Sequence, residues 1–192
     1  MGCEFRCGAA RIGRRSALGL GLSLALAPRL VLAQTEPARE RPKEGDLLVP
    51  VSGPSPEPLK PEDLQLDAKQ TFAWPMDPDT KTVRSGSRLN KVLLLRLDPE
   101  GFDPETKERA AEGVVAYSAI CTHTGCDVIS WHPDSQLLEC PCHYSLYNPK
   151  EAAKVVGGPS PRRLPALPLK TVDGRLVVAK PFTGRAGFQQ QM

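Results

Sequence analysis

Short apolar runs separated by turn-forming residues dominate the chain after residue 66. The two strongest are NKVLLLRL, at Asn90–Leu97, and VVAYSA, at Val114–Ala119. Short runs of this kind, set between turn residues, predict β-strands. We therefore expect the second half of the chain to be built mainly from strands.

Weaker apolar runs predict further short strands at Thr71–Trp74, Leu137–Glu139, Lys154–Val156, Leu167–Thr171 and Leu176–Ala179. The last two runs are joined by Val172-Asp173-Gly174-Arg175, an Asp-Gly turn that is typical of β-hairpins. One short helix is predicted at Asp103–Ala111, with Asp103 as its N-cap and Pro104 at its first position. Many short strands with so little helix predict a mainly β chain, folded as an antiparallel β sandwich or small barrel.

Residues 1–33 have the pattern of an export signal. An apolar run at Ala17–Ala27 follows four arginines, Arg6, Arg11, Arg14 and Arg15, and Val31-Leu32-Ala33 supplies small residues for a cleavage site. A membrane-spanning helix needs about 20 apolar residues, and Pro28 interrupts this run too early. The pair Arg14-Arg15 resembles a twin-arginine (Tat) signal, with an ordinary Sec signal as the alternative.

Composition separates the remainder of the 192 residues into three segments. Residues 34–66 are rich in Pro, Glu and Lys and have little to bury, which predicts an extended, polyproline-like arm that lies either along a partner or along its own domain. Residues 67–183 form the predicted β domain, and residues 184–192 a flexible tail. The net charge of +3 comes largely from the arginines of the signal, so no nucleic-acid partner is indicated.

The segment CTHTGCDVISWHPDSQLLECPCHYS, residues 121–145, contains four of the six cysteines and all three histidines. It holds two boxes, CTHTGC at 121–126 and CPCHYS at 140–145. A zinc site would pair Cys with Cys and His with His, and it would leave two cysteines unused. Two disulfides would leave the histidines without a role, and a Cys–His nucleophile would not explain why the arrangement occurs twice. An iron–sulfur cluster with two thiolates on one iron and two imidazoles on the other would use both boxes.

The boxes C-T-H-x-G-C and C-P-C-H-x-S resemble those of Rieske proteins, which hold a [2Fe–2S] cluster with His replacing Cys on one iron. The resemblance covers about Lys91–Lys180 and implies a Rieske-type antiparallel β sandwich with an inserted cluster-binding subdomain of two loops, 119–150. It implies thiolate and imidazole ligands at four positions, Cys121, Cys140, His123 and His143. It also implies a disulfide between Cys126 and Cys142.

Several residues near the boxes acquire expected roles from the same resemblance. Ser145 and Tyr147 match positions that donate hydrogen bonds to a bridging sulfide and to a ligand sulfur, which raises the potential. The segment 157–161, GGPSP, resembles the proline loop that covers the cluster. His132 lies outside both boxes and is predicted to be an exposed loop residue. Arg162-Arg163 form either a docking patch or a solvated face.

Three kinds of Rieske protein are candidates for the function of this chain. An oxygenase would generally lack the extra cysteine pair and would need a catalytic iron domain for which there is no room. The Rieske subunit of a cytochrome bc complex keeps a membrane helix and usually has Leu and Gly where this chain has Thr124 and Tyr144. These differences count against quinol oxidation, which we keep as the alternative function. We expect a periplasmic, high-potential electron-transfer protein or subunit, similar to the small subunit of arsenite oxidase.

This expectation also defines the partners. The expected redox partner is a molybdoenzyme-type large subunit or a cytochrome. The chain would relay single electrons between an oxidoreductase partner and a cytochrome-type acceptor. No catalytic site of the chain's own is evident in the sequence, and membrane association would require an uncleaved signal.

Overall fold

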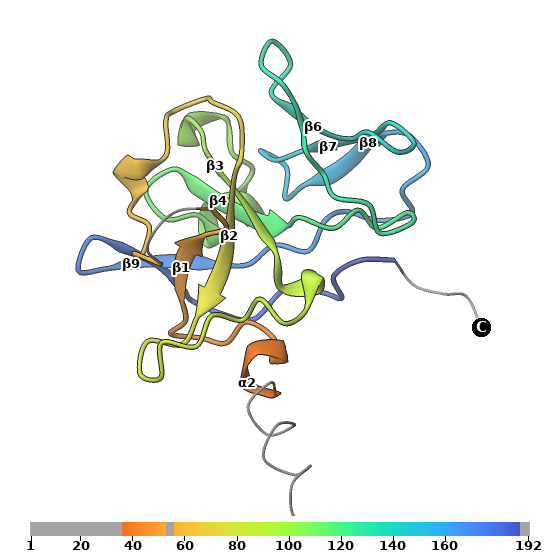
Figure 1. Cartoon of the computed structure of the whole chain (residues 1–192). Coiled ribbons are helices and arrows are strands. Elements are labelled where there is room, and N and C mark those ends of the chain that lie inside the picture. The colour runs from red at the N-terminus through yellow and green to blue at the C-terminus, as the bar shows by residue number, and fades with distance from the viewer. Residues whose placement is uncertain (1–35, 53–55, 189–192) are drawn as a thin grey trace, which may run out of the picture.

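The fold consists of two antiparallel β-sheets, as seen in a computed structural model that describes residues 36–52 and 56–188 (Figure 1). The larger sheet has the strand order β4-β3-β2-β1-β10-β9, and the smaller sheet has the order β5-β6-β7-β8. The smaller sheet is an insertion between β4 and β9. The prediction of a mainly β chain with an inserted subdomain is confirmed. The predicted export signal lies outside the described residues.

The larger sheet contains six strands, β1 (Leu47–Pro50), β2 (Thr71–Met76), β3 (Val92–Arg96), β4 (Val114–Ser118), β9 (Leu169–Val172) and β10 (Arg175–Val178). In β3 the side chains alternate between two hydrophobic cores, because successive residues of a strand point to opposite faces. Leu93 and Leu95 pack into the core on the smaller sheet's side, while Val92 and Leu94 pack into a second core. Burial on both faces explains why the NKVLLLRL segment is almost continuously apolar.

The smaller sheet contains β5 (Ser130–His132), β6 (Leu137–Cys140), β7 (Ser145–Asn148) and β8 (Lys154–Gly157). Leu138 of β6 and Tyr147 of β7 share one core with Leu93 and Tyr117 of the larger sheet. This shared core fixes the smaller sheet, and the two boxes at its end, on the rest of the domain. The strands β5 and β7 were not predicted.

The helices are short, and they comprise α2 (Glu36–Arg39), α3 (Pro104–Arg109) and the 3-10 turns η1 (Pro61–Asp63), η2 (Arg88–Asn90) and η3 (Pro99–Gly101). The predicted N-cap of α3 is confirmed, since the Thr106 amide donates to Asp103 Oδ1 over 2.7 Å. The helix ends before Ala111, because that residue forms a backbone pair with Val114 that turns the chain into β4. No helix in the described part of the chain is long and apolar enough to cross a membrane.

The predicted arm at 34–66 lies along the chain's own domain, but its central part is a buried strand and not the polyproline-like segment that was predicted. Residues Leu47–Pro50 form β1, which lies between β2 and β10 within the larger sheet. Leu48 and Val49 are fully buried there. The physical reason is that a short apolar run in a proline-rich context gains its stability from strand pairing and burial, which local composition does not reveal.

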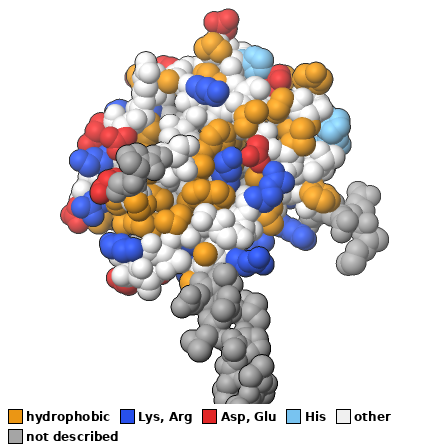
Figure 2. Space-filling view, viewed as in Figure 1, with side chains coloured by type: hydrophobic (Ala, Val, Ile, Leu, Met, Phe, Trp, Pro, Cys, Tyr) orange, Lys and Arg blue, Asp and Glu red, His pale blue; other side chains and the backbone are white. Residues whose placement is uncertain are grey.

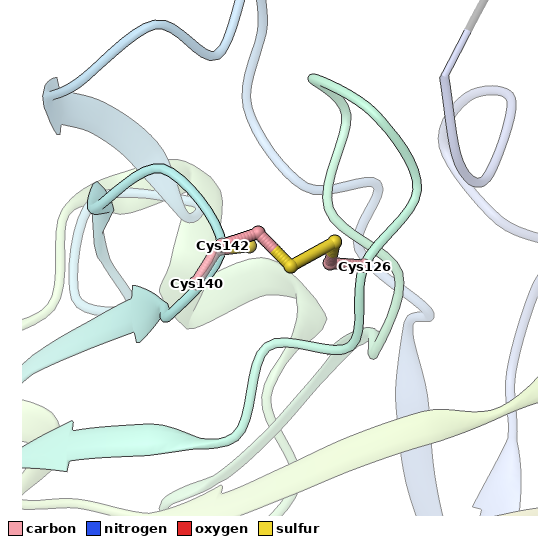
Figure 3. A group of neighbouring side chains, drawn as sticks. All are labelled: Cys126, Cys140 and Cys142. Carbon is pink, nitrogen blue, oxygen red and sulfur yellow. A yellow bond between two sulfur atoms is a disulfide. The ribbon is translucent and has the colours of Figure 1, made fainter.

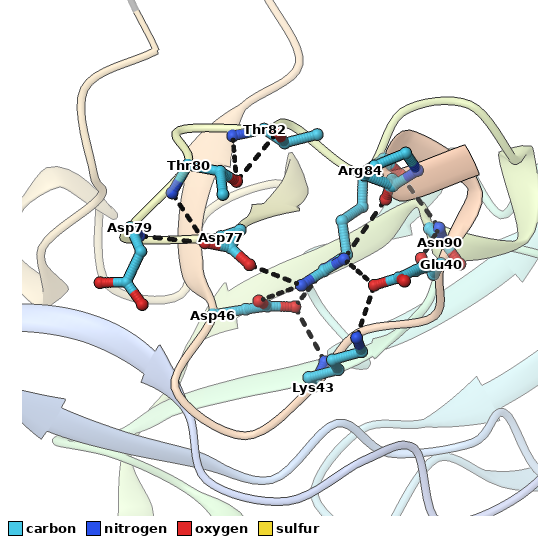
Figure 4. Close-up of polar contacts among 10 residues, drawn as sticks. Glu40, Lys43, Asp46, Asp77, Asp79, Thr80, Thr82, Arg84 and Asn90 are labelled. Atoms are coloured by element: carbon cyan, nitrogen blue, oxygen red, sulfur yellow. Dashed lines mark hydrogen bonds and ion pairs between the residues drawn. The ribbon is translucent and has the colours of Figure 1, made fainter. Parts of the chain in front are cut away.

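A buried ion-pair network attaches the N-terminal part of the described chain to the sheet (Figure 4). The Arg84 side chain, 2% exposed, donates to both oxygens of Asp46 over 2.7 and 2.9 Å. Arg84 also contacts Glu40 over 2.9 Å and Asp77 over 3.4 Å. Asn90 donates to the backbone oxygens of Glu40 and Arg84. These bonds tie residues 40–46 to the segment that connects β2 with β3.

The predicted flexible tail is likewise wrong for residues 184–188. Ala186 and Gly187 are buried. The Arg162 guanidinium donates to the backbone oxygens of Arg185 over 2.8 Å and of Gly187 over 2.5 Å. Because a guanidinium side chain binds backbone carbonyls here, apolar content alone gave no indication of the contact.

Candidate metal centre

The two boxes form adjacent loops at one end of the smaller sheet. Residues 121–126 follow β4, and residues 140–145 connect β6 to β7. A disulfide between Cys126 and Cys142 joins the loops (Figure 3), and the predicted pairing is confirmed. Each loop also closes on itself, since the amides of Gly125 and Tyr144 donate to the oxygens of Cys121 and Cys140. Each loop is thus closed by its own hydrogen bond, and the disulfide holds the two loops to each other.

Among the described residues two thiols remain free, those of Cys121 and Cys140, and both are buried at 1% exposure. The Cys140 sulfur lies within 4.8 Å of the sulfurs of Cys126 and Cys142 (Figure 3). Disulfide sulfurs are not thiolates, so they are not available as metal ligands. The two thiols that can bind a metal are therefore the pair that the sequence predicted as ligands.

The two predicted imidazole ligands also come together. The ring centroids of His123 and His143 are 4.7 Å apart in an edge-to-face arrangement. His143 is exposed, while His123 is half-buried and its Nδ1 atom is buried without a hydrogen-bond partner among the described residues. His132 is exposed as predicted, but it ends β5 and its Nε2 lies 2.9 Å from Glu139.

The electrostatics of the two thiols differ. Burial disfavours charge on both sulfurs, because a thiolate loses its hydration. At Cys121 burial is opposed by hydrogen bonds from the Ser160 and Tyr147 hydroxyls, the His123 backbone and Cys140, which together lower the thiol pKa below its ordinary value. At Cys140 burial raises the pKa to about 11, and the neighbouring Cys121 sulfur contributes to the rise. Two adjacent buried thiols of this kind ionise together only when a cation compensates them, as in a metal centre.

Two hydroxyl groups surround the Cys121 sulfur. Tyr147 Oη lies 3.2 Å from Cys121 Sγ, which is the contact that the family resemblance implies. Ser160 Oγ lies 3.4 Å from the same sulfur and 2.5 Å from Tyr147 Oη. Ser160 was not predicted as a site residue, and its position in the proline loop was the one signal that could have found it. Ser145 Oγ is buried and has no partner among the described residues.

The proline loop, residues 157–161, lies directly against the second box. At Gly158 the backbone has φ +79°, and an added Cβ would be 2.5 Å from Ser145 Cα and 2.6 Å from the Tyr144 oxygen. This close approach requires glycine, because any side chain would collide with the backbone. The loop thereby carries Ser160 to the Cys121 sulfur.

These residues fit a [2Fe–2S] centre with mixed ligands. The site offers two buried thiols that need a cation and a pair of neighbouring imidazoles, one with an unpartnered ring nitrogen. The unpartnered Ser145 hydroxyl is a donor available to a further acceptor. Two thiolates and two imidazoles are the ligand set of a Rieske cluster.

Comparisons with known proteins agree with this ligand set. A family model described as the Rieske [2Fe-2S] domain matches residues 90–168. The cytochrome bc1 complex Rieske iron-sulfur subunit of Streptomyces lividans is 32% identical over 133 residues, which cover 68% of this chain and 76% of that protein. A Haloferax mediterranei protein, described as the Rieske subunit of a respiratory nitrate reductase, is 38% identical over 106 residues. That match covers 54% of this chain and 47% of the relative.

Solved structures with a resembling fold include the ferredoxin of carbazole 1,9a-dioxygenase from Nocardioides aromaticivorans IC177. The likeness has a TM-score of 0.43 and 17% identity, and it covers 70% of this chain and 98% of that one. For the soluble domain of Rieske protein II from Sulfolobus acidocaldarius the TM-score is 0.37 with 17% identity, over 77% and 73% of the two chains. From the two boxes, the matched domain and the Streptomyces relative, the chain belongs to the Rieske [2Fe–2S] family of electron-transfer proteins.

Proposed function

We propose that the protein is exported and relays single electrons between an oxidoreductase partner and a cytochrome-type acceptor, through a high-potential Rieske cluster. The observation that carries this proposal is the pairing of two buried free thiols with two imidazoles on disulfide-joined loops, with His143 exposed. The Streptomyces and Haloferax relatives are named as subunits of redox complexes, which supports a redox partner protein.

The chain's own residues have separable roles in this function. Cys121 and Cys140 would hold one iron, and His123 and His143 would hold the other. The bound cluster supplies one-electron exchange. Tyr147 donates toward the Cys121 sulfur and stabilises negative charge there, which favours a potential in the positive part of the family range of about −150 to +300 mV.

Export to the periplasm rests on the predicted signal at residues 1–33. The Cys126–Cys142 disulfide supports it, because disulfides persist in oxidising compartments. N-terminal sequencing of protein isolated from its native host should find cleavage after Ala33. An intact Met1 in the membrane fraction would contradict a soluble exported carrier.

Quinol oxidation in a bc-type complex is the second candidate, and the name of the Streptomyces relative favours it. The surface beside the two imidazoles argues against it. Tyr144, next to His143, is 70% exposed, and Thr124, next to His123, is an exposed polar residue. Neither forms an apolar pocket for a quinone. Quinol-dependent cytochrome reduction by the isolated complex would decide for this candidate.

Metal analysis of the native protein tests the proposal directly. We expect about two irons and two acid-labile sulfides per chain, with the spectrum of a mixed Cys/His cluster on reduction. His143→Ala should abolish this spectrum, whereas His132→Ala, a matched control at a histidine outside both boxes, should leave it unchanged. Stoichiometric zinc without iron would overturn the proposal.

A further inference from the structure

Beside the metal centre lies a surface rich in cationic side chains. It consists of six residues that we call the basic face, Arg88, Lys91, Arg109, Arg162, Arg163 and Arg185. Figure 2 shows Lys and Arg side chains gathered on the lower right of the molecule, near the C-terminal end of the chain. The sequence suggested only Arg162-Arg163 as a patch, with docking and simple solvation both open.

The basic face is continuous because two cavities share Arg185. One, of about 330 Å³, is lined by Arg88 and Arg185, with Leu89 and Ile120 as apolar walls. The other, of about 270 Å³, is lined by Arg162, Arg163 and Arg185. Burial lowers the pKa of Arg162, and repulsion from the nearby Arg185 guanidinium lowers it further. Like charges are therefore held close together here.

The acidic residues on this surface do not neutralise it. Asp127 pairs with two cations, Arg88 and Lys91, and Glu105 pairs with another two, Arg109 and Arg163. Six cations against these two carboxylates give the basic face a net charge of +4. Residues 1–35 contain five arginines and one glutamate, and residues 53–55 and 189–192 are uncharged, so the described residues total −1. The rest of the described domain therefore carries −5, and the charge is strongly segregated.

The basic face is coupled to the metal centre by direct contacts. Thr122, which lies between Cys121 and His123, donates to the backbone oxygen of Arg162 over 2.6 Å. Gly125 of the first box lines the larger cavity, and a Cβ added there would be 3.1 Å from the Phe188 ring. A partner bound on this face would therefore lie against the first box.

We propose that the basic face docks the acidic surface of a redox partner protein, and this proposal rests on the proposed electron-transfer function. Complementary charge steers such encounters and sets their orientation. A protein is favoured over an anionic membrane surface because five of the six cations are arginines, and Phe188 is 45% exposed beside them. Arginine and aromatic side chains are enriched in protein interfaces, where lysine is depleted.

Arg185→Glu is the informative variant. The Arg185 side chain lines both cavities and forms no ion pair with another described residue, and the backbone oxygen that binds Arg162 is retained. Arg175→Glu is the matched control, because it makes the same change in total charge on an exposed residue of the β9–β10 hairpin. That hairpin lies on the opposite side of the molecule from the smaller sheet (Figure 1).

The test measures binding of the oxidised holoprotein to a small acidic c-type cytochrome, also oxidised, by calorimetry at low and high salt. We expect Arg185→Glu to weaken binding about tenfold at low salt and Arg175→Glu to weaken it less than about twofold, with the difference lost at high salt. Arg185→Glu should not weaken the binding of a basic cytochrome c, since such a protein is repelled by the basic face. Equal weakening by both variants, or no binding of the acidic cytochrome by the wild type, would overturn the proposal.

Two further measurements distinguish a membrane surface from a protein partner, and failure of the docking proposal from failure of the proposed electron-transfer function. Co-sedimentation with phosphatidylglycerol vesicles that is lost in Arg185→Glu, without cytochrome binding, would assign the face to a membrane surface and overturn the proposal. The binding assay transfers no electrons. Failure of the bound cytochrome to accept electrons from the reduced protein would therefore count against the proposed function and not against the docking surface.

Discussion

The hydroxyls around Cys121 allow the tuning of the metal centre to be tested by a double-mutant cycle. Tyr147 Oη and Ser160 Oγ lie 3.2 and 3.4 Å from the Cys121 sulfur and 2.5 Å from each other. Hydroxyl donors stabilise the more negative reduced state of an iron–sulfur centre. Tyr147→Phe and Ser160→Ala should therefore each lower the reduction potential.

The size of the shifts follows from hydrogen-bond energies. A hydrogen bond to a charged group is worth about 1.5–3 kcal/mol, and only its difference between redox states counts. A difference of about 1 kcal/mol corresponds to roughly 40 mV, since about 1.4 kcal/mol equals 59 mV for one electron. We expect about 40 mV for Tyr147→Phe and about half of that for Ser160→Ala, whose contact with sulfur is longer. The double variant should shift by less than the sum, because part of the Ser160 effect passes through the Tyr147 hydroxyl.

Protein-film voltammetry of the four holoproteins gives the cycle. Tyr117→Phe is the matched control, because its hydroxyl is also buried but donates to the Pro149 oxygen over 2.6 Å. That variant should lose about 1 kcal/mol of stability and keep its potential. Strictly additive shifts would refute a connected network, and an unchanged potential in Tyr147→Phe would refute any role of this contact in tuning.

Three further substitutions test the architecture that supports the centre. Gly158→Ala should lower the free energy of unfolding in urea by roughly 2–5 kcal/mol, because the added Cβ collides with the backbone. Gly174→Ala, at a similar φ in open space, should lower it by about 1–2 kcal/mol. Equal losses would contradict the close approach at Gly158. Asp46→Asn should cost about 3 kcal/mol, because the buried Arg84 guanidinium loses the buried carboxylate and keeps just the more exposed Glu40 and Asp77. Glu40→Gln, at an exposed carboxylate, should cost much less; similar thermal midpoints would show that the network is not decisive. Cys142→Ser should cost about 3 kcal/mol and speed iron release to a chelator; unchanged release would show that the disulfide does not hold the loops.

The chemistry of the site was visible in the sequence because it is local. Each box carries one thiol, one imidazole and one further cysteine within six residues. Their spacing is set by loop geometry and not by distant packing. The same holds for the β3 and β4 strands and for the cap of α3, where apolar runs or a single Asp-Pro pair dominate the local preference.

The features that sequence reasoning missed depend on long-range contacts. β1 is three apolar residues and a proline, and it becomes a strand only because β2 and β10 flank it. Arg84 would be expected at the surface, yet its ion pairs with Asp46 and Glu40 hold it in the interior, where its side chain is 2% exposed. Ser160 is 39 residues from Cys121 in sequence, so no local pattern connects them.

The arrangement of these residues separates control of the potential from control of docking. Ser160 and Tyr147 approach Cys121 from the buried side, where partners have no access. Arg185 lies on the outside, and its backbone oxygen is linked to the centre through the Arg162 side chain and the Thr122 hydroxyl, which binds the Arg162 backbone. Ser160→Ala should therefore shift the potential without changing the affinity for an acidic cytochrome, and Arg185→Glu should do the reverse. Because screening by solvent weakens a surface charge much more than a buried donor, a change of both properties by either variant would mean that the two regions are not independent.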